Sequence, residues 1–227
     1  MRETVGSTGP AVARAPLGEQ ARDAVRERVI DGRYPQGSRL VEREIAEELA
    51  MSRVPVREAL RSLVTEGLLE LLPHSGVRVR RLERSDVEQL YEVWEPLAVQ
   101  ASRLAARRVA EHAPQDPPGL DALRTALRRA DDAAAVGGGK PEVTANVSFH
   151  QRIVTLSGNR LLERTMEPLV WQLRLLFGLN TEPQHMRDQH HRMYADITSG
   201  EEETAAACTL LHVRDSRRAA LRSLPHG

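Results

Sequence analysis

The chain has 227 residues, of which 41% are hydrophobic, and its 32 basic residues balance its 32 acidic ones. This length allows one large or two small domains, and a net charge of zero gives no overall attraction to nucleic acid, so DNA binding would depend on a local group of charges. A single cysteine, Cys208, excludes an internal disulfide framework and predicts a protein of the reducing cytoplasm.

Residues 1–16 mix Gly, Ser, Thr and Pro without an apolar core. We therefore expect a disordered tail there and not a signal peptide. The most apolar later run, LVWQLRLLFGL from Leu169, is too short to cross a bilayer and contains Gln172 and Arg174. No membrane partner is predicted.

Three helices are predicted next, over residues 17–30, 42–50 and 52–67. The third has the clearest ends, because Ser52 is a natural N-cap, Pro55 falls in the first turn and Gly67 can close the C-terminus. Its apolar residues recur at the spacing of one buried face. They are Val56, Ala59, Leu60 and Leu63.

A second face of this third helix carries Arg53, Arg57 and Arg61, which are four residues apart. An arginine offers a rigid fork of donors that can pair with a guanine edge or hold a phosphate, so the stripe fits a helix lying in the major groove of DNA. The alternative is a solvated helix face whose arginines pair with nearby glutamates. The stripe alone leaves both interpretations open.

Two short strand-like runs follow, over residues 68–72 and 77–81, around the turn-forming residues 73–76. They predict a β-hairpin. His74 at its tip could contact a phosphate or lie in water, and water is the favoured interpretation.

The whole run LVEREIAEELAMSRVPVREALRSLVTEGLLELLPHSGVRV resembles the winged helix-turn-helix of the GntR family of bacterial transcription regulators. SRVPVREAL corresponds to the recognition helix of that family, and EGLLELLPHSGVRV to its wing. The resemblance implies that Arg43, Arg53 and Arg57 contact DNA. It also implies that Ser52 and Gly76 place the backbone against a phosphate or the minor groove.

After a linker at residues 82–84, only helical patterns appear, and Ser85 with Glu88 is typical of a capping box. We predict a winged helix-turn-helix DNA-binding domain over residues 17–81 and an all-α bundle of about six helices over 85–223, so the fold class is mainly α. The predicted helices span residues 85–110, 120–135, 142–156, 161–179, 184–198 and 202–221. Pro168 should kink the fourth of these or mark a later start.

Histidines carry the candidate chemistry of the bundle. Asn146 and His150 are four residues apart on an inward helix face, and His190 and His212 also lie on inward faces. If the last two helices fold back at residues 199–200, His190 and His212 lie about 15 and 18 Å from the turn and come level with each other. Three imidazoles and an amide oxygen suit Zn, Ni or another divalent ion.

Each of these histidines could instead be an ordinary core residue. His191 competes with His190, but its helix face carries Ala195 and Thr198, so His190 is preferred. The remaining histidines are expected in loops or the tail and exposed to solvent. They are His112, His185 and His226.

NVSFHQRIVTLSGNRLL, followed by HHRMYADITSGEEETAAACTLLH, is similar to the effector-binding domain of the FadR-type (FCD) subgroup of GntR regulators. That resemblance implies a helical bundle with a metal and an organic-acid pocket. The subgroup usually has Asp where this chain has Asn146, and often Arg and Glu where it has Trp94 and Ala98. A neutral amide binds cations more weakly than a carboxylate, so the identity and affinity of the metal are open.

The sequence therefore predicts a homodimeric transcription regulator, not an enzyme. It would bind a pseudo-palindromic DNA operator and respond to a small-molecule effector, an organic acid held near a divalent metal. One alternative is a regulator that senses the metal itself. A second is a metal-dependent hydrolase, against which stand the lack of a His-Asp dipeptide and of a carboxylate placed as general base near the proposed ligands.

Overall fold

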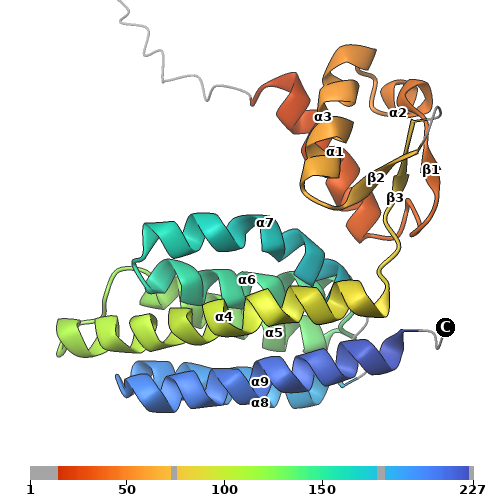
Figure 1. Ribbon diagram of the computed structural model, residues 1–227. Coiled ribbons are helices and arrows are strands. Elements are labelled where there is room, and N and C mark those ends of the chain that lie inside the picture. The colour runs from red at the N-terminus through yellow and green to blue at the C-terminus, as the bar shows by residue number, and fades with distance from the viewer. Residues whose placement is uncertain (1–14, 73–75, 178–181, 225–227) are drawn as a thin grey trace, which may run out of the picture. The chain divides into compact units, whose positions relative to one another are not determined.

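The computed structural model describes residues 15–72, 76–177 and 182–224, so residues 1–14 of the tail predicted over residues 1–16 lie outside them. The chain divides into two compact units, Met1–Arg80 and Arg81–Gly227. Each unit has its own secondary structure, helices with a small sheet in the first and helices alone among the described residues of the second (Figure 1). The predicted mainly α fold class is confirmed.

The first unit contains helices α1 (Leu17–Ile30), α2 (Glu42–Glu48) and α3 (Arg53–Thr65). The apolar face predicted for α3 is buried, and α3 packs against α1. Gly67 follows α3 with a φ of +74°, a left-handed conformation that glycine adopts without strain and that ends a helix. The core between the two helices fixes which face of α3 remains exposed.

The sheet of this unit has three strands, β1 (Arg39–Leu40), β2 (Leu69–Leu72) and β3 (Gly76–Val79), in the antiparallel order β1-β3-β2. The sequence predicted the β2–β3 hairpin but not β1. A run of two residues gives no alternation to detect, and its partner Val77 lies 37 positions further along the chain from Leu40. The predicted turn around His74 lies in residues 73–75, outside the described part of the chain.

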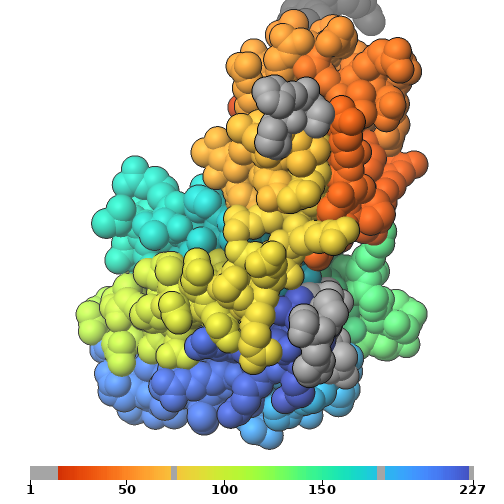
Figure 2. Space-filling model, turned by 45° about the vertical axis from the view of Figure 1, so that its right-hand side comes forward, coloured from red at the N-terminus to blue at the C-terminus, as the bar shows by residue number. Residues whose placement is uncertain are grey.

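The second unit is a bundle of helices, and α4 and α9 form its longest packed pair. Figure 2 shows the yellow and green atoms of α4 lying directly against the blue helices. The six helices span these residues: α4 (Arg84–His112), α5 (Leu120–Ala135), α6 (Lys140–Leu156), α7 (Arg160–Phe177), α8 (Pro183–Thr198) and α9 (Glu202–Ser223). The helix α7 continues through Pro168.

The start of α4 differs from the sequence prediction. The N-cap is Glu83, which forms a reciprocal capping box with Asp86, and the Glu83 amide donates to the Asp86 carboxylate at 3.0 Å. The predicted pair of Ser85 and Glu88 is therefore wrong by two residues. A glutamate is a poorer N-cap than serine in general, but here its carboxylate reaches the amide of the third helical residue.

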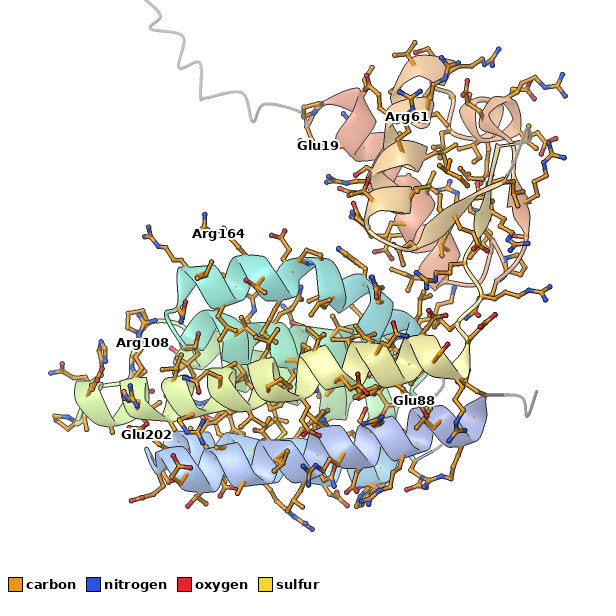
Figure 3. The ribbon with its side chains drawn as sticks, in the orientation of Figure 1. Glu19, Arg61, Glu88, Arg108, Arg164 and Glu202 are labelled. Atoms are coloured by element: carbon orange, nitrogen blue, oxygen red, sulfur yellow. The ribbon has the colours of Figure 1, made fainter. Side chains whose placement is uncertain are left out.

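Small side chains let α4 and α9 approach closely. Ala105 on α4 and Ala205 on α9 are fully buried, and the Thr209 hydroxyl donates to Ser102 at 2.7 Å inside the interface. Arg107 of α4 and Glu202, the first residue of α9, form an ion pair at 2.7 Å. Figure 3 labels Glu202. Within the described ranges, no helix combines the length and hydrophobicity needed to span a membrane.

Candidate nucleic-acid interface and metal centre

The exposed face of α3 presents two arginines that one carboxylate holds in place. Glu42, the first residue of α2, accepts hydrogen bonds from Arg53 Nε at 2.9 Å and from Arg57 Nε at 2.8 Å and Nη2 at 2.9 Å. The Arg53 and Arg57 side chains are 63% and 49% exposed, whereas that of Glu42 is 22% exposed. The hydrogen bonds from Arg57, aided by those from Arg53, lower the pKa of Glu42 to about 2.

This arrangement orients both guanidinium groups without using all of their donors. Arg53 engages Glu42 through Nε, so its terminal nitrogens can reach an outside acceptor, and Arg57 keeps Nη1 for the same purpose. The sequence identified the two arginines but not Glu42. The signal that could have found it is the acidic residue at the start of the preceding helix, which the tight turn between α2 and α3 brings level with the start of α3.

The other predicted DNA-contacting residues occupy varied positions. Arg43 is 72% exposed and lies 3.9 Å from Glu47, too far for a firm ion pair. Ser52 has extended backbone at the N-cap of α3, but its side chain makes no capping hydrogen bond, contrary to the expectation from sequence. Gly76 opens β3 with a φ of +96°. Arg61 is exposed on α3 of the same unit (Figure 3). DNA contact by these residues stays a prediction.

In the second unit, three imidazoles from three helices converge. His150 on α6, His190 on α8 and His212 on α9 are at most 5% exposed. The Nε2 atom of His212 lies 3.3 Å from Nε2 of His190 and 3.3 Å from Nε2 of His150. The length argument that placed His190 level with His212 therefore agrees with the structure. The helix carrying His150 comes to the same point.

Burial keeps these rings neutral. Loss of hydration lowers the pKa of His150 and of His190 well below the usual value, and the neighbouring imidazoles lower it further. Burial lowers the pKa of His212 to about 4, although the carboxylate of Asp215 opposes this shift. Neutral imidazoles have a free nitrogen lone pair at pH 7, which is the form that binds a metal ion.

A buried glutamine sets the orientation of His212. Gln189 Nε2 lies 2.6 Å from Asp215 Oδ2, which can only accept, so the opposite side of the amide is the oxygen. That oxygen is 2.9 Å from Nδ1 of His212. Nδ1 must therefore carry the proton, and the lone pair of His212 is on Nε2, where it faces the other two rings. His185 joins this network from within α8 and not from a loop, contrary to the sequence prediction.

The donor set fits a divalent metal ion. Ligands at 2.0–2.1 Å from tetrahedral zinc are roughly 3.3–3.4 Å apart, which agrees with the two separations of 3.3 Å from His212 Nε2. The ligand atoms of all three histidines lie within 4.8 Å of one another. Asn146 lies one helical turn before His150, and its buried Oδ1 has no hydrogen-bond partner in the described structure. A buried amide oxygen without a hydrogen-bond partner, in the lining of the same cavity as His190, is a candidate for the fourth ligand.

The other histidines do not belong to this cluster. His191 is exposed and lies 3.0 Å from Asp131, and His112 is the last residue of α4. His74 and His226 lie outside the described residues. Over the described ranges, the group of possible ligands consists of the three imidazoles and includes no carboxylate or thiol.

Two cavities lie near the histidines. One, of about 170 Å³, has Asn146, His190, Glu142 and Arg187 in its lining. The other, of about 680 Å³, opens between α6 and α7 and has Trp94 in its wall. Trp94 also packs edge-on against His150, with ring centroids 5.7 Å apart. Of these two cavities, the smaller one has residues of the candidate metal centre in its lining.

Comparison with known protein families gives two matches. Residues 17–79 match the family described as bacterial regulatory proteins, gntR family. Residues 89–215, which are more than half of the chain, match the FCD domain. The first match covers the candidate nucleic-acid interface, and the second covers the three histidines.

Curated relatives and solved structures agree with these matches. The chain is 29% identical over 210 residues to a probable D-xylose utilization operon transcriptional repressor of Paenarthrobacter nicotinovorans, covering 91% of this chain and 90% of the relative. It is 30% identical over 182 residues to the Nta operon transcriptional regulator of Aminobacter aminovorans, covering 80% and 83%. The fold is similar to that of a transcriptional regulator from Rhodococcus sp. RHA1, with a TM-score of 0.77, 24% identity and coverage of 92% and 99%.

Proposed function

Because this chain belongs to the GntR family of bacterial transcription regulators and carries an FCD domain, we propose that it is a homodimeric, cytoplasmic regulator controlled by a small organic acid bound at a divalent metal. The observation that carries the metal is the convergence of three buried, neutral imidazoles. The buried oxygen of Asn146, which lies one helical turn before His150 and has no hydrogen-bond partner, adds support. Family membership makes the chain a transcription regulator and not an enzyme, so the hydrolase alternative falls away.

The proposed contacts with DNA begin at α3. Arg53 and Arg57, held by Glu42, would read base edges or clamp phosphates, and Arg43 would add a phosphate contact. Ser52 and Gly76 would place backbone close to the duplex. Two copies of α3 related by a two-fold axis would meet the two half-sites of a pseudo-palindromic operator.

The proposed metal would be held by Asn146, His150, His190 and His212, as zinc or nickel with open positions for a ligand. All four of these ligands are neutral, so the ion keeps its full double positive charge. A site that lacks the usual aspartate therefore binds the cation more weakly but attracts an anionic ligand more strongly. That balance supports an organic acid as the effector.

The effector would act by changing the equilibrium between two arrangements of the dimer that differ in DNA affinity. A coupling of about 1–3 kcal/mol between effector and DNA is enough for a useful switch. The site and α3 belong to different units of the chain, so the proposed switch requires a coupling between the two units.

The test uses the full-length protein, prepared metal-free and loaded with Zn²⁺ or Ni²⁺. Selection from a random pool of DNA duplexes should yield an inverted repeat, and Arg57→Ala should weaken binding to it by about 1–3 kcal/mol. Short organic acids should change operator affinity only in the metal-loaded form. No enriched duplex at low salt would refute DNA reading by this chain.

A regulator that senses the metal itself is the second candidate, because the same histidines support it. The same titrations separate the two. If Zn²⁺ or Ni²⁺ alone switches operator affinity fully and no acid adds to the effect, the ion is the signal.

A further inference from the structure

The smaller cavity is lined by two chemically different groups of residues. Asn146 and His190 belong to the proposed metal centre, and Glu142 and Arg187 lie about one helical turn earlier on the same two helices. Its volume of about 170 Å³ is close to the roughly 150 Å³ that holds a benzene molecule in an engineered protein cavity. There is room for a compact molecule of about six to nine non-hydrogen atoms.

Glu142 and Arg187 form an ion pair that is largely withdrawn from water. Arg187 Nη1 donates to Glu142 Oε1, and Arg187 Nη2 donates to Gln184. The Arg187 and Glu142 side chains are only 17% and 15% exposed. A charge in such a place needs a partner, because leaving it unpaired costs far more than an exposed charge would. A molecule that binds one member of this ion pair must therefore supply the charge that the other member now provides.

The helix spacing fixes the reach of such a molecule. Glu142 and Asn146 are four residues apart on α6, and Arg187 and His190 are three apart on α8. At about 1.5 Å per residue, the ion pair and the metal-binding end are separated by roughly 4.5–6 Å along the helices. A linear acid of three to five carbons with an oxygen donor at each end spans that distance.

Building on the proposed function, we infer that Arg187 is the residue that recognises the carboxylate of the effector, and that Glu142 is an internal competitor occupying that place in the effector-free protein. The far oxygen of the acid would face Asn146 and His190. Binding would exchange the Glu142 carboxylate for that of the ligand, so the pocket selects anions with two donors and rejects neutral molecules of the same size.

The loop before α6 supplies the room for Glu142. Gly137, Gly138 and Gly139 all have positive φ, and a Cβ added to Gly138 would lie 2.5 Å from Oε2 of Glu142. Any other residue at 138 would therefore push the carboxylate from its present place. The glycines leave the first turn of α6 open on this side, where a displaced Glu142 can turn toward water.

The experiment measures binding of malonate, succinate and glutarate to the Zn²⁺-loaded full-length protein by isothermal titration calorimetry. Glu142→Gln removes the competitor and should bind at least one of these acids tenfold or more tightly than the parent. The double variant Glu142→Gln/Arg187→Gln leaves no unpaired charge, so its thermal midpoint should stay near that of the parent. It should not show the tenfold increase in acid affinity that is expected for Glu142→Gln alone. Succinamide, the neutral counterpart of succinate, should not bind to the parent protein or to either variant.

Two matched controls change the same charges elsewhere in the bundle. Glu92→Gln on α4 and Arg192→Gln on α8 alter exposed residues and should leave acid affinity unchanged. The inference is overturned if Glu142→Gln binds no acid of the series more tightly than the parent. It is also overturned if the double variant binds as tightly as Glu142→Gln.

The proposed function fails through a different result. If Zn²⁺ does not bind, or if no acid alters operator affinity in any variant, the metal-dependent switch is wrong. If Zn²⁺ binds and acids shift operator affinity equally with and without Arg187, the switch stands and the assignment of Arg187 fails.

Discussion

Gln189 is the residue on which the orientation of His212 depends, and its role could not be found from the sequence. It is buried between the Nδ1 proton of His212 and the carboxylate of Asp215. Gln189 directly precedes His190 in the sequence, but no local pattern shows how its side chain is rotated. The three histidines were predictable because each lies on an apolar face of its helix. The turn at Gly200 brings His190 and His212 to the same height along their two helices.

Replacing Gln189 by methionine keeps the side-chain volume but removes the acceptor for the Nδ1 proton of His212. We expect the affinity for Zn²⁺ to fall by about 10- to 100-fold, the usual effect of losing a partner that orients a histidine ligand. Competition with a fluorescent chelator measures it. Gln151→Met, an exposed change on α6, is the control, and equal affinities in the two variants would contradict the role of Gln189.

The stabilisation that Glu42 provides by pairing with Arg53 and Arg57 on α3 depends on pH. Its pKa is lowered from 4.5 to about 2 in the folded protein, so the unfolded chain takes up a proton first as the pH falls. The stabilisation is therefore complete above pH 4.5 and is lost progressively toward pH 2. The thermal midpoint of the parent should exceed that of Glu42→Gln at pH 7, and the difference should narrow at pH 3. A constant difference would show that the ion pairs contribute nothing.

The same variant separates orientation from charge at the DNA surface. Without Glu42 the local charge is more positive, so binding to random duplex should strengthen, but Arg53 and Arg57 lose the group that fixes them. We expect the ratio of operator affinity to random-duplex affinity to fall several-fold. Fluorescence anisotropy with both duplexes at one salt concentration measures the ratio, and a ratio equal to that of the parent would exclude a positioning role for Glu42.

Among the elements, the pair of α4 and α9 forms the most extensive interface of the bundle. Both helices carry buried alanines, and a Cβ on Gly200, just before α9, would lie 3.0 Å from Cβ of Ala110. Gly200 also has a φ of +78°, which disfavours any residue with a side chain. The tight turn at Gly200 and the small residues together set the height of His212 relative to His190.

Enlarging a buried residue in this interface should be costly. Ala105→Leu inserts three carbons where Ala105 is fully buried, and we expect a loss of about 1–3 kcal/mol in the free energy of unfolding. Denaturant titration measures it. Arg107→Gln, which breaks the exposed pair with Glu202, should cost less than Ala105→Leu because water screens an exposed ion pair. The opposite ranking would show that surface charge holds the two helices together.

The element boundaries show what local signals can predict. Helix α5 has the predicted limits, because glycine and proline residues flank it on both sides. Strand β1 and the capping box at Glu83 were missed, since each depends on a partner or a rotamer that a local pattern does not reveal. The pairing of Glu42 with two arginines, and of Glu142 with Arg187 45 positions away, belongs to the same group.

For the whole molecule, a net charge of zero makes the salt dependence of DNA binding informative. If each subunit of a dimer places Arg43, Arg53 and Arg57 against phosphates, six cations displace counterions. The slope of log affinity against log salt should then be about −5, and Arg57→Ala should make it shallower by about 2. Binding measured across a range of salt concentrations tests this, and an unchanged slope in the variant would remove Arg57 from the phosphate contacts.

The three imidazoles are separated by 62 positions from the first to the last, so an ion shared among them would close long loops of the polypeptide. Closing such loops through the ion reduces the number of conformations open to the unfolded chain. An ion that binds only to the folded protein also shifts the folding equilibrium toward the folded state by mass action. Scarcity of the ion in the cell would then leave more of the chain open to proteases. The amount of this protein, and not only its activity, would follow the supply of metal.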